Sequence, residues 1–307
     1  MNASDLTNNA KSLLQSIREG NTHILARSIS LIENEAPAYS KILEALEGDY
    51  PSSIIGITGP PGSGKSTLVD GLVGQWVQQD KKVAVLCVDP SSPFHLGALL
   101  GDRIRMSEWY NHPQVFIRSL ATRGSLGGLH PKIIEITDLL KAAEFDFIIV
   151  ETVGVGQSEV EISGLADTTV VVLVPEAGDE IQTMKAGLME IADIFVVNKC
   201  DRPDADRFIK HLQTIFDFNI TGEQQEPIIV KTVASERKGL QELAEKILQH
   251  RKNINEEQKI VMLAEKAHRL IIQKRVQDIR KNELINKIRK AMLEPGFNIY
   301  EFIKRNF

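Results

Sequence analysis

A glycine-rich stretch at residues 59–67, GPPGSGKST, carries the groups that could hold the phosphates of a nucleoside triphosphate. It fits the pattern GxxxxGK[ST], in which glycines let consecutive backbone N–H groups turn toward phosphate oxygens. We expect Lys65 to reach the β- and γ-phosphates and the Ser66 hydroxyl to bind Mg²⁺. The residues expected to contact the nucleotide here are Gly59, Pro60, Pro61, Gly62, Ser63, Gly64, Lys65, Ser66 and Thr67.

The segments on either side of this loop support the same interpretation. SIIGIT (53–58) before it has the pattern of a buried strand, and STLVDGLVGQWV (66–77) after it has the pattern of an amphipathic helix. A helix in this position presents its positive N-terminal end to the same phosphate. Strand, loop and helix together predict nucleoside triphosphate binding. They do not show which base the nucleotide carries or what the protein uses the nucleotide for.

A second motif, NKCD at residues 198–201, indicates which base is bound. It ends an apolar run downstream of the phosphate loop, at the sheet edge where ligands lie in open α/β folds. Asp201 can accept hydrogen bonds from both N1–H and N2–H₂ of guanine, and adenine lacks this pair of donors. Lys199 can lie along the base plane, and Asn198 can connect this loop to the phosphate loop. The motif alone is a modest signal, so its position carries the prediction of GTP and GDP binding.

A weaker indication of guanine lies at the end of PIIVKTVA (227–234). Val233 and Ala234 are placed there like a small-residue loop that offers a backbone N–H to guanine O6. We therefore include both residues in the expected nucleotide site.

Three acidic residues end predicted buried strands or lie in the loops that follow: Asp89, Asp102 and Glu151. With Ser66 they would supply the oxygen ligands that Mg²⁺ prefers, directly or through water. Glu151 begins ETVG, at the place where DxxG stands in a common GTPase, and it can reach the metal through water. Simpler roles remain open, because Asp89 can start a turn before a proline and Asp102 can pair with a neighbouring arginine on the surface.

Seven short apolar runs between residues 52 and 250 alternate with amphipathic segments. They are rich in Val and Ile and mostly lack polar alternation, as expected for strands buried on both faces of a parallel sheet. The amphipathic segments would supply the covering helices that such strands need, so we predict an α/β P-loop NTPase fold with a mostly parallel sheet. The runs are SIIGIT (53–58), KVAVLCVD (82–89), VFIRSL (115–120), FDFIIVET (145–152), TTVVVLVP (168–175), DIFVVNK (193–199) and PIIVKTVA (227–234).

Three parts of the chain follow from these patterns: a helical N-terminal extension (1–50), a nucleotide-binding domain (51–250) and a helical C-terminal arm (251–307). The arm holds 14 Lys and Arg against 7 Asp and Glu, and it has apolar stripes at helix spacing. It can dock on the main domain with its basic residues solvated, or it can bind another subunit or an acidic partner. Self-association is slightly favoured, because a long helical tail must bury its apolar stripe somewhere.

The composition narrows the class of protein. The 307 residues are 42% hydrophobic and 25% charged, as in folded soluble proteins, and the formal net charge of −5 gives no reason to expect nucleic acid. The two cysteines, Cys87 and Cys200, lie far apart, so neither a disulfide framework nor a zinc site is indicated. We find no signal peptide and no apolar stretch long enough to cross a membrane, and we expect a cytoplasmic protein without membrane attachment.

The combined motifs resemble the MeaB/ArgK family of P-loop GTPases, the G-protein chaperones of adenosylcobalamin-dependent methylmalonyl-CoA mutase. The resemblance covers nearly the whole chain, and the segments that carry it are GPPGSGKST, VDPSSP, LLGDRIRM, ATRGSLGGL, VETVGVGQSEVEI and AGDEIQTMKAGLMEIADIFVVNKCD. It implies Mg²⁺-dependent hydrolysis of GTP to GDP and phosphate, a homodimer formed through the C-terminal arm, and a B12-dependent acyl-CoA mutase as partner. It leaves open which mutase is served and whether a cobalamin adenosyltransferase is a further partner.

The resemblance also implies roles for single residues. In the family, the acids that match Asp89, Asp102 and Glu151 lie at the Mg²⁺ and hydrolysis site. The segment VPEAGDEIQTMKAG (174–187) matches a mobile loop that responds to the mutase, and Lys185 within it is a candidate for completing the site.

Two segments depart from the family pattern. FHLG (94–97) stands where a Thr/Ser-Gly-Gly run is usual, which puts the mobility of that loop or the identity of the mutase in doubt. Glu176 stands where glycine is usual, which puts the resting conformation of the 174–187 segment in doubt.

The leading prediction is a GTPase that gates adenosylcobalamin loading and protects the loaded mutase, with switch loops held by GTP and released on hydrolysis. One alternative is a nickel-insertion GTPase of the hydrogenase or urease type, which would predict a Cys/His cluster near the phosphate loop, and the sequence has none. Another alternative is a protein kinase of an amino-acid transport system. The nucleotide motifs permit a kinase, but guanine specificity and switch-like loops are more typical of a regulatory GTPase, which times an event by hydrolysis.

Overall fold

The computed structural model describes residues 10–36, 39–46, 50–89, 103–122, 129–152, 158–177, 191–219, 228–253, 256–276, 279, 281–293 and 297–307. Asp102, Lys185 and the 94–97 segment lie outside this described part, so the expectations placed on them stay predictions.

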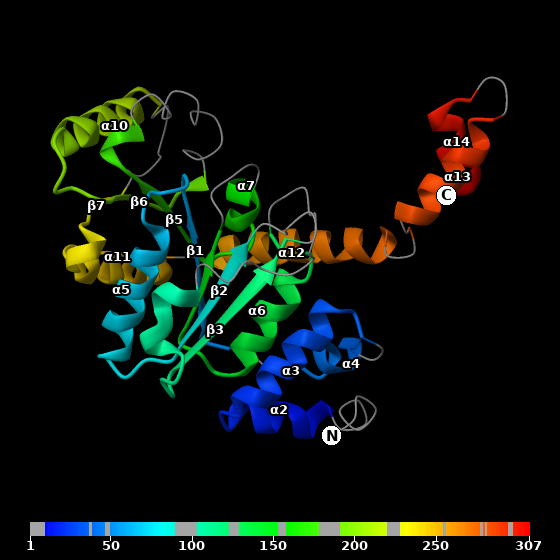
Figure 1. Cartoon of the computed structure of the whole chain (residues 1–307), viewed down its shortest axis with the longest axis horizontal. Coiled ribbons are helices and arrows are strands. Elements are labelled where there is room, and N and C mark those ends of the chain that lie inside the picture. Colours follow the sequence, from blue (N-terminus) through cyan, green and yellow to red (C-terminus); the bar gives the residue numbers. More distant parts are fainter. Residues whose placement is uncertain are drawn as a thin grey trace. The chain divides into compact units, whose positions relative to one another are not determined.

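A seven-stranded, all-parallel sheet forms the centre of the fold (Figure 1). The strand order is β3-β2-β4-β1-β5-β6-β7, so β1 lies in the middle and later strands are added on both sides of it. All seven predicted strands are confirmed. Their bounds are β1 Ser53–Thr58, β2 Val83–Asp89, β3 Val115–Ala121, β4 Phe147–Glu151, β5 Thr168–Leu173, β6 Ile194–Val197 and β7 Ile228–Lys231.

Helices cover both faces of this sheet, which explains the near-continuous apolar runs. The helices α5 (Lys65–Val77) and α11 (Leu240–Asn253) pack on one face, where they meet Ile55 and Ile57 of β1. Gly56, between these two isoleucines, faces Ile162 of α7 (Ser158–Ser163) on the opposite face. That opposite face is also covered by α6 (Ile133–Ala142) and α10 (Ala205–Asn219).

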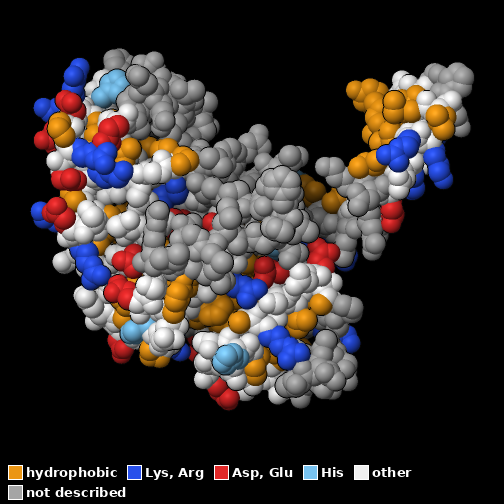
Figure 2. Space-filling model, viewed as in Figure 1, with side chains coloured by type: hydrophobic (Ala, Val, Ile, Leu, Met, Phe, Trp, Pro, Cys, Tyr) orange, Lys and Arg blue, Asp and Glu red, His pale blue; other side chains and the backbone are white. Residues whose placement is uncertain are grey.

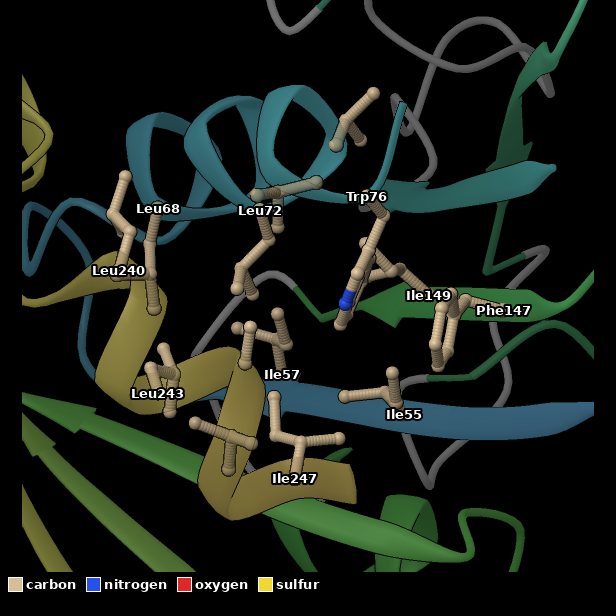
Figure 3. Packing of buried hydrophobic residues seen from close by; sticks show 14 of the residues in the cluster. Ile55, Ile57, Leu68, Leu72, Trp76, Phe147, Ile149, Leu240, Leu243 and Ile247 are labelled. Atoms are coloured by element: carbon tan, nitrogen blue, oxygen red, sulfur yellow. The ribbon is translucent and has the colours of Figure 1, made fainter. Parts of the chain in front are cut away.

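The core between the sheet and the pair α5–α11 holds the first turns of α5 in place (Figure 3). Trp76, near the end of α5, stacks on Phe147 of β4 with ring centroids 4.1 Å apart. Leu68 and Leu72 of α5 and Leu243 of α11 contribute to the same core over β1. Because α5 begins directly after the phosphate loop, this packing fixes the loop relative to the strand ends.

The N-terminal helices α2 (Ala10–Arg18), α3 (Thr22–Glu33) and α4 (Tyr39–Glu44) belong to the same compact unit as the sheet. Arg118 of β3 donates to Ser30 Oγ at 2.9 Å and forms an ion pair with Glu33. Lys132 donates to the Tyr39 hydroxyl at 3.3 Å. Burial opposes the charge of Lys132, but Glu135 and Tyr39 outweigh this effect and raise the lysine pKa.

A second compact unit contains residues 256–307, and the break between the units follows Asn255. It contains α12 (Glu256–Val276), α13 (Lys281–Ala291) and α14 (Ile299–Asn306), so the C-terminal region is helical as predicted. Large apolar side chains are exposed on these helices, as Figure 2 shows for the C-terminal end. The break lies a few residues beyond the predicted boundary at 250, because α11 continues to Asn253.

Within the described residues, no helix has the length and apolar character needed to span a bilayer.

Candidate nucleotide-binding site

The carboxyl ends of β1, β2, β4 and β6 meet at one edge of the sheet, and each carries part of the expected site. The phosphate loop follows β1, Asp89 ends β2, Glu151 ends β4 and the NKCD turn follows β6. In a parallel sheet all carboxyl ends lie on the same edge, so segments distant in sequence meet there. A pocket of about 430 Å³ at this edge is lined by Pro61, Gly62, Gly64, Lys65, Ser66, Thr67, Cys87, Val88, Glu151, Thr152 and Lys199.

At two positions of the phosphate loop, both the backbone conformation and the lack of space for a Cβ atom require glycine. Gly59 has a φ of 139°, and a Cβ added there would lie 2.2 Å from the Val172 carbonyl oxygen. Gly64 has a φ of 92°, and a Cβ there would lie 2.3 Å from Nδ2 of Asn198. Residues with a side chain are disfavoured at such positive φ values, and each added Cβ would also force its neighbour to move.

Lys65 begins α5 and is buried, with its ammonium group folded over the phosphate loop. Its Nζ donates to the carbonyl oxygens of Gly59 at 2.8 Å and Pro60 at 3.0 Å. A buried ammonium group needs such acceptors or an anion, because burial of an unpaired charge is costly. The structure thus places a lysine charge beside the pocket, at the positive N-terminal end of α5.

Ser66 lies beside Glu151 at the end of β4, and Asp89 ends the neighbouring strand β2. The Ser66 hydroxyl donates to Oε1 of Glu151 at 2.7 Å. Cys87 and Glu151 are register partners in the neighbouring strands β2 and β4, and Asp89 lies two residues further along β2. Both carboxylates are buried, Asp89 at 6% and Glu151 at 5% exposure. One hydroxyl and two carboxylates at one sheet edge form an oxygen-rich group of the kind that binds Mg²⁺.

Asn198 connects the NKCD turn to two other loops, as the sequence predicts for its connection to the phosphate loop. Its Nδ2 donates to the Ser63 carbonyl oxygen at 2.8 Å. Its Oδ1 accepts from Thr232 Oγ1 at 3.1 Å and from the Ala234 backbone N–H at 3.0 Å. One buried amide therefore holds three loops together, which fixes the NKCD turn relative to the phosphate loop.

The rest of the NKCD turn becomes more exposed toward its end: Lys199 and Cys200 are partly buried, and Asp201 is exposed. Lys199 adopts a φ of 59°, and its Nζ donates to the Gly62 carbonyl oxygen at 2.7 Å. The lysine side chain therefore reaches from the NKCD turn to the phosphate loop along the pocket. Asp201 is exposed at the end of this turn, where its carboxylate can meet a ligand from solution. Its role in guanine recognition stays a prediction.

The loop at Val233 and Ala234 lies beside Asn198. In this structure both backbone N–H groups have internal acceptors: Val233 donates to Lys238 O at 3.1 Å and Ala234 to Asn198 Oδ1 at 3.0 Å. A bond from Ala234 to guanine O6 would therefore share or replace its bond to Asn198, and this contact also stays a prediction.

The pocket includes residues that the motifs did not indicate. Cys87, Val88 and Thr152 line it because they precede or follow the acidic strand ends. Thr152 Oγ1 donates to Thr58 Oγ1 at 2.8 Å, which joins the ends of β1 and β4. The sequence shows polar residues at the ends of buried strands. It does not show which of these side chains face the pocket, because that depends on how the strands pair.

A parallel sheet with a phosphate loop after its central strand and an NKxD turn at the same edge defines a P-loop G protein. The family model described as "Methylmalonyl Co-A mutase-associated GTPase MeaB" matches residues 25–292. The chain belongs to this family, and it is a GTPase that binds GTP and GDP.

Two relatives and one solved structure illustrate the range of similarity. A Pyrococcus horikoshii protein described as a GTPase is 45% identical over 291 residues, which cover 92% of this chain and 89% of that protein. The "Methylmalonic aciduria type A homolog, mitochondrial" of Caenorhabditis elegans is 38% identical over 209 residues, covering 63% of this chain and 52% of that protein. A crystal structure titled "LAO/AO transport system kinase" matches with a TM-score of 0.65 at 22% identity, covering 95% of this chain and 92% of that one. This structural likeness shows the fold.

Proposed function

We propose that this GTPase is a chaperone of a B12-dependent acyl-CoA mutase, with methylmalonyl-CoA mutase as the preferred partner. It would gate the loading of adenosylcobalamin and protect or reactivate the loaded enzyme. The observation that carries this proposal is the match to a family described as associated with methylmalonyl-CoA mutase over residues 25–292. The similarity to the C. elegans protein named for methylmalonic aciduria supports the same partner.

The geometry supports a defined arrangement of GTP within the proposed site. The phosphates would lie against the backbone of residues 59–67, where Lys65 can exchange its carbonyl acceptors for phosphate oxygens. The base would lie against the NKCD turn, with its plane along the Lys199 side chain and its N1–H and N2–H₂ groups on Asp201. The connection through Asn198 would keep the base and phosphate ends of the site at a constant separation.

Ser66 and Glu151 line the pocket with a hydroxyl and a carboxylate, and Asp89 ends the neighbouring strand at the same edge of the sheet, so these residues fit a Mg²⁺ ion. When bound, the ion would neutralise charge that develops on the phosphates during hydrolysis. Glu151 would orient Ser66 through their hydrogen bond, and the buried carboxylates would be offset by the cation. The proposed contributions of Asp102 and Lys185 rest on the family resemblance.

The proposed partners are a second copy of the chain, the mutase and, as an open question, a cobalamin adenosyltransferase. The exposed apolar side chains of the C-terminal unit support self-association through this unit, since isolated helices seldom expose so many large apolar groups in water.

The direct test is GTP hydrolysis with and without the purified mutase that shares the genome of this protein. Intrinsic turnover should be slow, and the mutase should raise it by about tenfold or more, which corresponds to about 1.4 kcal/mol of barrier lowering. Transfer of adenosylcobalamin to the mutase, followed by its absorbance, should depend on GTP hydrolysis. Turnover that no B12-dependent mutase alters would count against the proposal.

The kinase alternative makes a different prediction for the γ-phosphate. A chaperone GTPase releases it as inorganic phosphate, whereas a kinase transfers it to a protein. Incubation with γ-labelled GTP and candidate transport proteins should therefore leave the label in solution. Label recovered on a protein would contradict the proposed function.

A further inference from the structure

Both turns that flank the proposed guanine site contain a residue other than glycine in the left-handed backbone region. Lys199 has a φ of 59° in the NKCD turn, and Arg237 has a φ of 56° shortly after Ala234. This conformation is disfavoured for residues with a Cβ, so contacts with the surroundings must hold it. Contacts of Arg202 and Arg237 join these two turns to the rest of the unit.

The NKCD turn is held from outside by an ion pair. Arg202, the residue after Asp201, closes the turn through its backbone N–H, which donates to Lys199 O at 3.1 Å. Its guanidinium group pairs with Glu176 in the short helix η2 (Pro175–Ala177), and η2 also contacts α10. The hydrogen bond from Arg202 lowers the Glu176 pKa, because it favours the charged carboxylate.

The turn after Ala234 is held in a similar way. The guanidinium group of Arg237 lies 3.3 Å from Oε1 of Glu108 in the short helix η1 (Arg103–Trp109). The neighbouring Trp109 donates its indole N–H to Asp70 of α5 at 2.8 Å. This second turn is thereby connected to the helix that begins at the phosphate loop.

We propose that Arg202 and Arg237 are positioning residues for guanine recognition, acting through their ion pairs with Glu176 and Glu108. The proposal rests on the proposed role of the NKCD turn. Each ion pair joins a strained turn to an element outside it, so its loss should let the turn relax. Asp201 would then be placed less accurately for the two guanine donors. The four side chains are 44–55% exposed, so each pair should contribute modestly.

Inosine nucleotides provide a readout that a general loss of structure would not change. Inosine lacks the 2-amino group of guanine, so the ratio of GDP affinity to IDP affinity reports how well the protein recognises that group. Arg202→Ala should weaken GDP binding by about two- to fivefold and IDP binding less, so the ratio falls. Arg237→Ala and Glu176→Ala should act in the same direction, and the effects should shrink at high salt.

A matched control lies at the opposite ends of the strands. Lys81 and Asp146 form an ion pair of 3.1 Å with side chains 45% and 36% exposed, just before β2 and β4. Lys81→Ala should leave the GDP to IDP ratio unchanged. The double variant Arg202→Glu with Glu176→Arg should restore the ratio toward that of the wild-type protein, because it rebuilds the ion pair with reversed charges.

Calorimetric affinities for GDP and IDP, with unfolding temperatures to confirm folding, distinguish the outcomes. Equal losses for GDP and IDP, or changes no larger than those of Lys81→Ala, would overturn the proposal. Asp201→Asn serves as the reference, since it should alter the ratio more than either arginine variant. An unchanged ratio in Asp201→Asn would instead contradict the guanine role of the NKCD turn, and with it this proposal.

Discussion

The hydrogen bond between Ser66 and Glu151 joins the phosphate loop to the end of β4 at 2.7 Å. Because the Glu151 carboxylate is buried, its charge is favourable only where polar groups or a cation compensate for lost water. The same physical condition holds for Asp89 on the neighbouring strand. A Mg²⁺ ion in this position would therefore both compensate for the buried carboxylate charges and take part in GTP hydrolysis.

Replacement of Glu151 by Gln tests this interpretation, since it keeps the shape of the side chain and removes its charge. We expect Glu151→Gln to lower GTP hydrolysis by at least about a hundredfold, because metal-assisted stabilisation is worth several kcal/mol. GDP affinity measured with a chelator present should change little. Glu242→Gln on the exposed face of α11 is the control. Hydrolysis equal to that of the control would rule out a role for this carboxylate.

The sequence predicted the motif residues because their spacing is fixed by backbone geometry within one loop. Lys65, Ser66 and Asn198 therefore lie where the motifs place them. Arg202 and Glu176 were not predicted to pair, because that contact depends on how two separate loops leave neighbouring strands. Asp102 and Lys185 lie outside the described residues, and their roles stay predictions.

For the secondary-structure elements too, features set by neighbouring residues could be predicted and features set by distant contacts could not. All seven strands could be predicted, since strands buried on both faces require continuous β-branched and apolar runs. Their order could not, because the runs resemble one another and nothing local selects a neighbour.

Leu243 of α11 tests how strongly the packing of elements stabilises the site. Its side chain is fully buried between α11, α5 and the sheet. We expect Leu243→Ala to lower the free energy of unfolding by about 2–5 kcal/mol, measured by urea denaturation. Glu242→Ala on the exposed face of the same helix should change it by less than about 0.5 kcal/mol. Similar effects for the two variants would contradict the described core.

At the scale of the whole molecule, the chain forms two compact units with different surfaces. The unit of residues 1–255 buries many described apolar side chains around the sheet. The unit of residues 256–307 exposes many of its own, including Leu293 at 84% and Tyr300 at 80%. Such a surface is favourable in water only when another surface covers it, which is the physical argument for the proposed homodimer.

The oligomeric state can be measured by analytical ultracentrifugation. The wild-type protein should sediment as a dimer, and the double variant Leu293→Asp with Tyr300→Asp should sediment as a monomer. Tyr110→Asp, which replaces an exposed aromatic residue near the sheet, should leave the dimer intact. A wild-type monomer, or a double variant that still forms the dimer, would show that this unit does not mediate self-association.

The proposed function requires that guanine nucleotide hydrolysis by this protein is coupled to a B12-dependent mutase. Its most direct test is the mutase-stimulated turnover of Asp201→Asn with GTP and with XTP. An amide at this position should no longer suit the 2-amino group of guanine and should favour the 2-oxo group of xanthine. We expect the mutase to stimulate the variant with XTP and no longer with GTP at the same concentration. Stimulation that still follows GTP, or that is absent with both nucleotides while the wild-type protein responds, would contradict it.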